Sequence, residues 1–233
     1  MESFLNQVIT KNWGEILDNT ILLNIIKELD IIYKEKTVYP KKSKVFKMFQ
    51  LLEHDKIKVV ILGQDPYSSL CTKTISNESM DPEPYAQGMA FSVGENMKPP
   101  KSLEIILNSI SEQFYYGMQI PLPSPNLDRW IEQGVFLLNT SLTVEANTPN
   151  SHKKLWEDFT KNFLLTLSAY NPNVIYLLWG KEAQQFQKYI SSGFVLKDIH
   201  PNAVSYNKDL KFNGGFNECN NLLKSLNSAP IVW

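Results

Sequence analysis

The segment Lys56-Ile-Lys-Val-Val-Ile-Leu-Gly-Gln-Asp-Pro-Tyr67 decides the fold class. Its first part is largely apolar and β-branched, and the apolar run ends at Gly63. A short apolar run of this kind is typical of a strand buried on both faces, as in a parallel sheet that helices cover. The polar residues Gln64 and Asp65 are therefore expected just beyond the carboxyl end of a buried strand.

Three further segments repeat this strand pattern, and they are 135–139, 174–179 and 193–198. Apolar residues at helical spacing predict helices over 13–33, 102–114, 155–168, 181–190 and 217–226. Strands that alternate with helices indicate right-handed crossovers and a mainly parallel sheet. We therefore expect an α/β fold with a central, mainly parallel four-stranded sheet flanked by helices. One domain is expected over 1–233, with 1–36 as an N-terminal helical extension.

The composition bounds the class of protein. The chain has 233 residues, 43% hydrophobic and 20% charged, which is typical of one globular domain and excludes a disordered chain. It has no apolar run of membrane-spanning length, and residues 1–6 lack the pattern of a signal peptide. Cys71 and Cys219 are too few for a disulfide framework and lack zinc-ligand spacing. We expect an intracellular protein with two free thiols and no membrane contact.

The net charge of −1 does not by itself suggest a nucleic acid as partner. Many nucleic-acid binders carry an excess of Lys and Arg, because phosphate contacts supply much of their affinity. A nearly neutral chain has to bind DNA through a local basic face, and the motifs have to reveal that face.

Polar residues follow the predicted strands. In open parallel sheets, functional groups gather beyond the carboxyl ends of the strands, which lie at one edge. Asp65, Asn139 and His200 follow or end three of these strands, and Gly180-Lys181 follows the fourth. One Asp and one His are too few ligands for a metal site, so no metal is expected. No serine occupies a Gly-x-Ser-x-Gly elbow, which disfavours a serine-type triad.

Taken singly, these residues have ordinary explanations. Asp65 before a proline suits a turn, and Asn139 suits a turn cap. His200, which also precedes a proline, suits a loop, and Phe91 would by default be a core residue. No one of them establishes a function.

Taken together and in order, the motifs resemble those of the family-1 uracil-DNA glycosylases from about Thr37 to Trp233. The matching segments are Gly-Gln-Asp-Pro-Tyr at 63–67, Gly-Met-Ala-Phe-Ser-Val at 88–93, Lys-Pro-Pro-Lys-Ser-Leu at 98–103, Gly-Val-Phe-Leu-Leu-Asn-Thr-Ser-Leu-Thr-Val at 134–144, Ser-His at 151–152, Trp-Glu-Asp-Phe-Thr at 156–160, Leu-Leu-Trp-Gly at 177–180, His-Pro at 200–201 and Pro-Ile-Val-Trp at 230–233. The resemblance implies a monofunctional uracil-DNA glycosylase that needs no cofactor. Such an enzyme flips uracil out of DNA and hydrolyses its N-glycosidic bond, which initiates base excision repair.

The resemblance also implies how uracil is read and cleaved. Phe91 would stack on the base, the Asn139 amide would match O4 and N3–H, and Tyr67 would exclude the methyl group of thymine. Gln64 would belong to the same substrate site. Asp65 would position water and stabilise the sugar cation, as in sugar hydrolysis. His200, as a neutral imidazole, would stabilise the uracil anion at O2.

A second set of residues would contact DNA. Its members are Pro99, Pro100, Lys101, Ser102, Gly180, Lys181, Val204 and Ser205. The stiff Lys98–Ser102 segment resembles the family's proline-rich loop, which presses on the strand. Ser102 either donates to a phosphate while also capping the following helix, or only caps that helix. Lys101 and Lys181 stand where the family more often has Pro and Ser, and they would add local positive charge.

The chain departs from the family at three places. Val204 stands where the family has the leucine that fills the gap left by the flipped base, so a weaker plug is expected. Ser68 replaces a histidine of the family. The 18 residues of 68–85 replace a short loop and are expected to form an excursion at the pocket rim. DNA contact, partner contact and a neutral insertion all remain open for this excursion.

The expected partners are uracil-containing single- or double-stranded DNA and a proteinaceous inhibitor, and the chain is expected to be a monomer. One alternative is a DNA-binding replication accessory on the same scaffold, with secondary or lost catalysis. Another is a glycosylase for a different base. The sequence favours the uracil enzyme because it retains the whole set Asp65, Tyr67, Phe91, Asn139 and His200.

Overall fold

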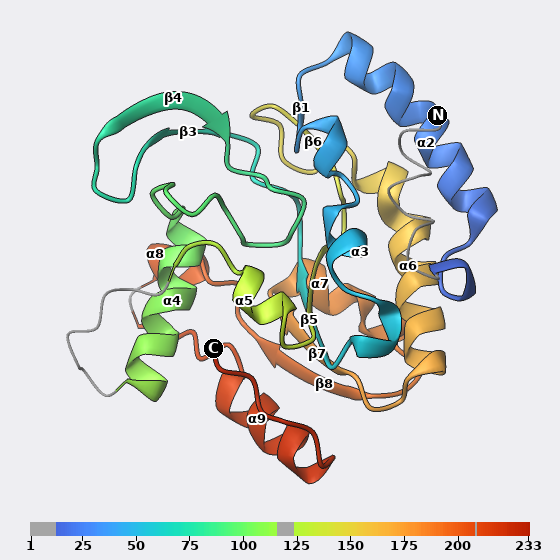
Figure 1. Cartoon of the computed structure of the whole chain (residues 1–233), viewed down its shortest axis with the longest axis vertical. Helices are drawn as coiled ribbons and strands as arrows, with labels where there is room; N and C mark the ends of the chain where they lie inside the picture. The colour runs from blue at the N-terminus through green and yellow to red at the C-terminus, as the bar shows by residue number, and fades with distance from the viewer. Residues whose placement is uncertain (1–12, 116–123, 208) are drawn as a thin grey trace.

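The computed structural model describes residues 13–115, 124–207 and 209–233. Residues 1–12, the first part of the predicted N-terminal extension, lie outside them. At the centre is a parallel sheet with the strand order β5-β2-β7-β8 (Figure 1). Its strands are β2 (Val59–Gly63), β5 (Val135–Asn139), β7 (Ile175–Trp179) and β8 (Phe194–Asp198). The predicted α/β fold with a four-stranded parallel sheet is confirmed.

The register brings the carboxyl ends of the strands to one level. Gly63 of β2 pairs with Asn139 of β5, and Trp179 of β7 pairs with Asp198 of β8. Every residue of β2, β5 and β7 is buried, whereas β8, at one edge of the sheet, is mostly half-buried. The segments that leave the sheet at this edge therefore start close together.

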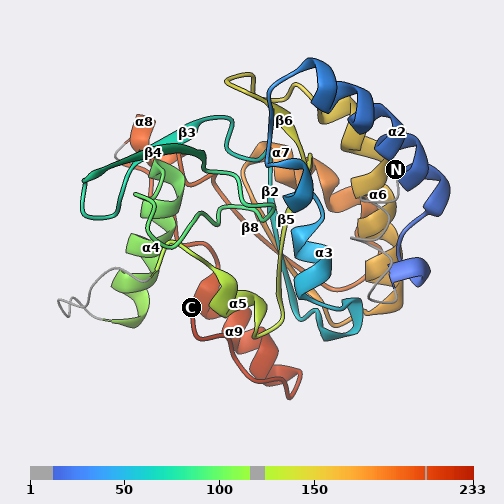
Figure 2. The ribbon, with the colours of Figure 1, turned by 45° about the horizontal axis from the view of Figure 1, so that its top comes forward.

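Helices cover both faces of the sheet. Side chains of adjacent strand positions point to opposite faces. Phe136 of β5 stacks on Phe163 at 5.3 Å, whereas Trp179, in the opposite phase, meets Phe216 at 5.7 Å. These partners belong to α6 (Lys153–Tyr170) and α9 (Phe216–Ser225), and α2 (Asn19–Glu35) lies outside α6 (Figure 2).

The predicted helix over 13–33 is interrupted. A short turn, η1 (Trp13–Glu15), precedes Asp18, whose carboxylate accepts hydrogen bonds from the N–H groups of Thr20 and Ile21. This N-cap starts α2. The remaining helices are η2 (Lys42–Lys44), α3 (Lys47–Leu51), η3 (His54–Lys56), α4 (Lys101–Phe114), α5 (Asp128–Ile131), α7 (Lys181–Gln184), η4 (Gln185–Tyr189) and α8 (Ala203–Tyr206). In the described part of the chain, no helix combines the length and apolarity needed to cross a membrane.

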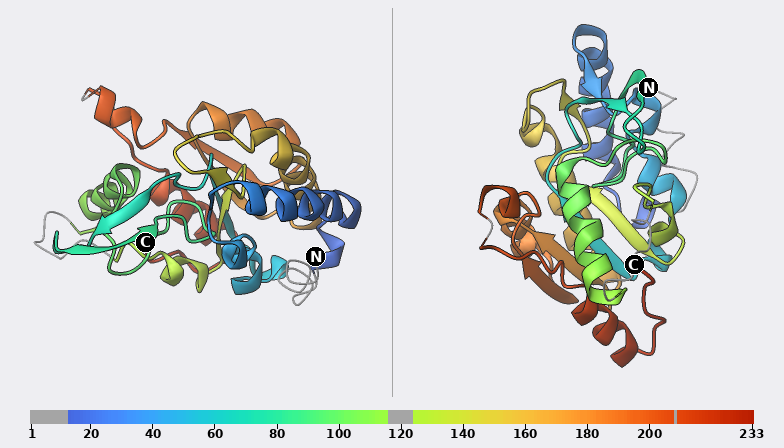
Figure 3. Two further views of the ribbon diagram at one scale, coloured as in Figure 1. Left: turned by 90° about the horizontal axis from the view of Figure 1, so that it is seen from above. Right: turned by 90° about the vertical axis from the view of Figure 1, so that its left-hand side faces the viewer.

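The excursion after Tyr67 contains a β-hairpin. Strands β3 (Leu70–Lys73) and β4 (Ser79–Pro84) pair antiparallel and lie beside the start of α4 (Figures 1 and 3). The sequence did not reveal them because most of their side chains are exposed. A further two-stranded ladder joins β1 (Val38–Tyr39) to β6 (Val144–Glu145).

Candidate active site

Gly63 allows two predicted substrate residues to lie side by side. A Cβ atom at this position would overlap Oδ1 of Asn139 and would lie 3.4 Å from Cε2 of Phe91. The segments that follow Gly63 and Asn139 also lie side by side, since the Thr140 N–H donates to the Gly63 carbonyl at 2.9 Å. Asn139 and Phe91 are both buried. The structure thus brings together two residues that are far apart in the sequence.

Asp65 has one occupied and one free carboxylate oxygen. Its Oδ2 accepts a hydrogen bond from the backbone N–H of Asn150 at 2.7 Å. Its Oδ1 is buried and makes no hydrogen bond to any residue that the structure describes. The Gln64 amide lies 3.4 Å from Oδ2 and donates to Oδ1 of Asn150 at 3.0 Å. Asn150 therefore orients the carboxylate, and Gln64 holds Asn150.

Phe91 joins the two halves of the site. Its ring centroid lies 5.2 Å from that of Trp179 and 6.4 Å from that of His200. Its backbone has φ of 64°, a left-handed conformation that is unusual for a bulky residue and that the surroundings must impose. The aromatic ring and the His200 imidazole therefore belong to one cluster at the carboxyl edge.

Tyr67 is fixed by its hydroxyl group. This group lies 2.8 Å from Oγ of Ser102 and 3.4 Å from the carbonyl oxygen of Phe91. Burial raises the pKa of Tyr67 above its ordinary value, so the phenol stays protonated. The hypothesis that Ser102 caps the helix is wrong, because α4 begins at Lys101 with Pro100 at the N-cap position. Ser102 instead lies inside the helix, is 3% exposed and supports the Tyr67 ring.

The imidazole of His200 is held in one orientation. Its Nδ1 accepts a hydrogen bond from the backbone N–H of Asn202 at 3.2 Å. Burial lowers the pKa of His200 below its ordinary value, which favours the neutral ring. Gly180 has φ of 86° and makes room for the backbone and Cβ of His200, because an added Cβ would lie 2.7 Å from Cβ of His200. Gly180 was predicted as a DNA contact, and its close approach to His200 was not foreseen.

Two residues of the site were missed by the sequence reasoning, although their segment matched the family at Ser151-His152. Asn150 bonds to Asp65, as described. His152 is 5% exposed, and its Nδ1 lies 2.8 Å from Oγ1 of Thr143. Burial lowers the pKa of His152, opposed by the nearby charges of Glu145 and Asp65. No motif rule pointed to Asn150, because its backbone N–H makes the contact.

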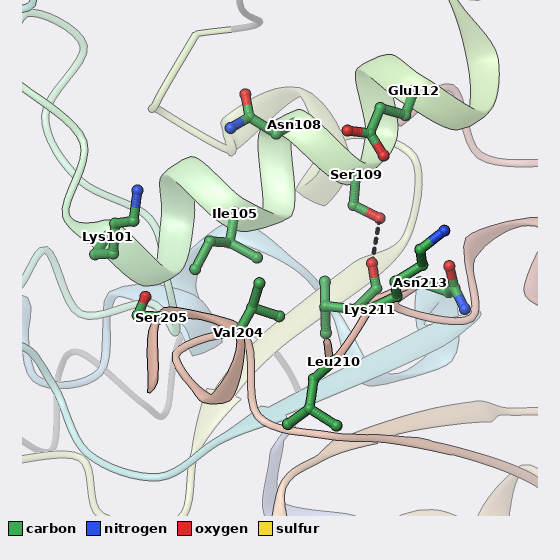
Figure 4. Close-up of a pocket in the computed structure, with 11 residues that line it drawn as sticks. Lys101, Ile105, Asn108, Ser109, Glu112, Val204, Ser205, Leu210, Lys211 and Asn213 are labelled. Atoms are coloured by element: carbon green, nitrogen blue, oxygen red, sulfur yellow. Dashed lines mark hydrogen bonds between the residues drawn. The ribbon is translucent and has the colours of Figure 1, made fainter. Parts of the chain in front are cut away.

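Five of the eight predicted DNA-contact residues line two neighbouring pockets. Lys101, Val204 and Ser205 line a pocket of about 510 Å³ between α4 and α8, where Val204 faces Ile105 (Figure 4). A second pocket of about 510 Å³ is lined by Gly180, Lys181, His200 and residues around them. Pro99 and Pro100 immediately precede α4 and are half-buried. The Lys101 ammonium is 3.1 Å from the Glu104 carboxylate, which offsets part of its predicted positive charge.

The described residues hold no group of three or more His, Cys, Asp or Glu side chains able to bind a metal ion. Cys71 and Cys219 are buried free thiols.

Comparisons with known proteins place this arrangement in context. Residues 49–224 match the family model of the uracil DNA glycosylase superfamily. The chain is 35% identical to a uracil-DNA glycosylase of Fusobacterium nucleatum subsp. nucleatum over 97% of this chain and 96% of that protein. It is 35% identical to that of Aliarcobacter butzleri over 95% of this chain and 99% of the relative. Its structure is similar to mimivirus uracil-DNA glycosylase, with a TM-score of 0.75, 26% identity, and coverage of 100% of this chain and 92% of that chain. It is also similar to a variant of the mimivirus enzyme in complex with UGI, with a TM-score of 0.77, 28% identity, and coverage of 100% and 86%.

Proposed function

The chain belongs to the uracil-DNA glycosylase superfamily and is a uracil-DNA glycosylase, and from this premise we propose how the residues at its carboxyl edge divide the reaction. In that reaction the oxygen of water bonds to C1′ of the deoxyribose. The electrons of the C1′–N1 bond leave with uracil, and the proton that the attacking water loses balances the proton that uracil later takes up. Positive charge develops on the sugar and negative charge on the base, so a site has to stabilise both.

Phe91 and Asn139 recognise the extruded base. The aromatic ring stacks on the face of uracil, and the amide of Asn139 donates to O4 and accepts from N3–H. Their common contact at Gly63 and their burial support this assignment. Cytosine has the reverse pattern of donor and acceptor at these atoms. It would leave buried polar groups unpaired and is therefore rejected.

Tyr67 excludes thymine. A methyl group at C5 of the base would collide with the Tyr67 ring, which is fixed beside that atom. The two contacts of its hydroxyl group, to Ser102 and to the Phe91 carbonyl, support a fixed ring. Tyr67 and Phe91 are thus coupled, one at the edge of the base and one on its face.

Asp65 holds the attacking water and stabilises the sugar cation. The geometry supports this role because Oδ2 is occupied by the Asn150 N–H, whereas Oδ1 is buried and free to accept from water. This pair of oxygens is the observation that carries the proposal. A carboxylate that only shaped a turn would have no need of a buried free oxygen, because such an oxygen costs free energy unless it is used.

His200 stabilises the leaving uracil. Since the Asn202 N–H donates to Nδ1, the proton of the neutral ring is on Nε2, which can donate to O2 of uracil. Asn202 acts as a positioning residue through His200. Gly180 allows the backbone and Cβ of His200 to approach the end of β7, and the lowered pKa of His200 favours the neutral donor.

The DNA duplex is handled by the Lys98–Ser102 loop and by α8. We assign this loop, which includes Pro99, Pro100 and Lys101, to pressing on the DNA strand around the uracil. Gly180, Lys181 and Ser205 contribute phosphate contacts. Val204 fills the gap left by the flipped base. The position of Lys101 and Val204 on opposite sides of one pocket supports a shared DNA face (Figure 4).

The mimivirus complex supports the further proposal that UGI binds this chain as well. A monomeric state and an intracellular location remain predictions. No observation favours the accessory protein with lost catalysis.

The test is uracil release, measured with chelator present, from single- and double-stranded oligonucleotides that carry uracil, thymine or mismatched bases. Release from uracil DNA alone is expected. Failure to release uracil from any of these substrates would overturn the proposal.

A further inference from the structure

The hairpin β3–β4 is bonded to the segment that leads into the proline-rich loop. The Ile75 N–H donates to the carbonyl of Asn96 at 2.9 Å, and the Lys98 N–H donates to the carbonyl of Lys73 at 3.0 Å. Between these bonds, residues 74 and 97 form an antiparallel bridge. Residues 96–98 therefore act as a third strand beside the hairpin.

Both strands of the hairpin and its base are also anchored in the protein. Cys71 of β3 is fully buried, and Met80 of β4 packs against the core. At the base of the hairpin, the Tyr85 ring meets that of Tyr67 edge to face at 5.9 Å. The segment after Tyr67 is thus packed on the substrate site at one end and bonded to 96–98 at the other.

The turn of the hairpin also holds a side chain of the loop. Ile75, Ser76 and Asn77 form a three-residue turn, in which the Asn77 N–H donates to the Thr74 carbonyl at 2.9 Å and Asn77 has φ of 63°. A type I turn followed by a left-handed residue is a common hairpin connection. Oδ1 of Asn77 accepts a hydrogen bond from the Lys98 ammonium at 2.7 Å. Both the backbone and the side chain of Lys98 are therefore tied to the hairpin.

The charges and prolines of the hairpin disfavour two other roles. Glu78, Asp81 and Glu83 are exposed, and their carboxylates repel DNA phosphates. Pro82 and Pro84 lack N–H groups, and prolines and charges on an edge strand disfavour pairing with a strand from another protein. The bonds of the hairpin to residues 96–98 are therefore the observation that points to its role.

We propose that the hairpin is a brace that fixes the loop 98–102 before DNA binds. The hairpin holds Lys98, and the Tyr67 hydroxyl, 2.8 Å from Ser102 Oγ, holds the other end. A loop that is already ordered does not lose conformational entropy when it presses on the strand, which favours DNA binding. The inference rests on the proposed function of this loop. Ile75 acts through Asn96 and Asn77 acts through Lys98, so both are positioning residues.

Ile75→Pro tests the brace with little other change. Position 75 is the first central residue of the turn, where proline is favoured, and its side chain is 48% exposed. The substitution removes the one N–H that donates to Asn96. Ile75→Ala is the matched control, because it removes the side chain and keeps the N–H group.

Relative to Ile75→Ala, we expect Ile75→Pro to exchange the Lys98 amide hydrogen about threefold to tenfold faster in the absence of DNA, the factor typical of one hydrogen bond. KM for a uracil-containing duplex should rise by a similar factor, whereas kcat for a single-stranded oligonucleotide and inhibition by free uracil should not change. Equal exchange rates and equal duplex KM values in the two variants would overturn the brace.

Two further measurements keep this test separate from protein folding and from the proposed function. If Ile75→Pro does not fold, Asn77→Gly retains the left-handed turn and removes the acceptor for Lys98. It should also speed exchange at the Lys98 amide, and an unchanged rate would contradict the proposal. Because exchange is measured without DNA, it tests the brace even if the wild-type protein released no uracil. That second result would overturn the proposed function instead.

Discussion

The backbone N–H of Asn202 donates a hydrogen bond to Nδ1 of His200 at 3.2 Å, so the neutral imidazole carries its proton on Nε2. The hydrogen-bond donor of the ring is therefore Nε2, the ring nitrogen farther from the backbone of His200. The loop that follows β8 therefore selects the tautomer as well as the position of the side chain.

The first prediction concerns His200 and pH. Burial lowers the pKa of His200, so the neutral donor persists to more acidic pH than for an exposed histidine. The decrease of kcat with falling pH that depends on His200 should therefore occur at pH values below the ordinary pKa of histidine. His200→Gln should lower kcat by about 10²–10³-fold, as loss of one preorganised donor does. Profiles of kcat against pH for both proteins measure this. A histidine-dependent limb above the ordinary pKa would contradict a neutral donor.

The same pKa shift affects stability. Because the folded protein binds a proton at His200 less readily than the unfolded chain does, the free energy of unfolding is highest above the ordinary histidine pKa. It decreases as pH falls from that value to the lowered pKa. His152 should act in the same direction, because burial lowers its pKa too. Urea denaturation between neutral and mildly acidic pH should show a smaller loss of stability for His200→Gln than for the wild type.

The second prediction concerns Asp65. Asp65→Asn should lower kcat by about 10²–10³-fold, as loss of one preorganised electrostatic contact does, because the amide lacks the negative charge that stabilises the sugar cation. Affinity for uracil-containing DNA should be retained, which a binding assay at equilibrium measures. Asp55→Asn, which changes an exposed carboxylate of η3, is the control and should leave kcat unchanged. Full activity of Asp65→Asn would exclude the proposed role.

The third prediction concerns base selection by Asn139. Asn139→Asp removes the amide donor and places a charge in a site where the native residue is 6% exposed. We expect kcat/KM for uracil DNA to fall by at least about tenfold, since a buried group is left unpaired. The ratio of uracil to cytosine cleavage should fall as well. An unchanged ratio would refute the assignment of Asn139 to O4 and N3–H.

The sheet, and the position of the candidate site at its carboxyl edge, were predictable for a physical reason. Strands buried on both faces need continuous apolar runs, and parallel strands deliver their following residues to one edge. Asp65, Asn139 and His200 could therefore be grouped from their positions alone. The Asp65–Asn150 bond could not be predicted in this way, because it spans 85 residues and uses a backbone N–H that every non-proline residue has.

The hairpin was hidden for a related reason. Leu70 and Lys73 of β3 are both exposed, and β4 contains two prolines, so neither strand shows the alternation that predicts a half-buried strand. Its pairing with 96–98 depends on backbone groups, which leave no pattern in the sequence. The prediction of an excursion at the rim located the segment and missed its regular structure.

The last prediction concerns the plug on α8. Val204 is half-buried, packs against the core and faces Ile105 across the pocket (Figure 4). Leucine has one more CH₂ group, and burying it in the DNA stack would contribute about 0.8 kcal/mol. Val204→Leu should therefore increase kcat/KM for a uracil-containing duplex about fourfold and leave the single-stranded substrate unchanged. Steady-state kinetics on the two matched substrates measures the difference.

Tyr206 provides the comparison that makes this prediction specific. It lies two residues beyond Val204 and is 90% exposed, so its ring is accessible to a base of DNA. Stacking of one base on an aromatic ring contributes about 1–3 kcal/mol, more than the added CH₂ group. If Val204 fills the gap, Tyr206→Ala should lower duplex and single-strand activity by the same factor, because a surface stacking contact does not depend on the flipped state. If Tyr206→Ala lost activity only on the duplex and Val204→Leu gained none, Tyr206 and not Val204 would be the residue that fills the gap.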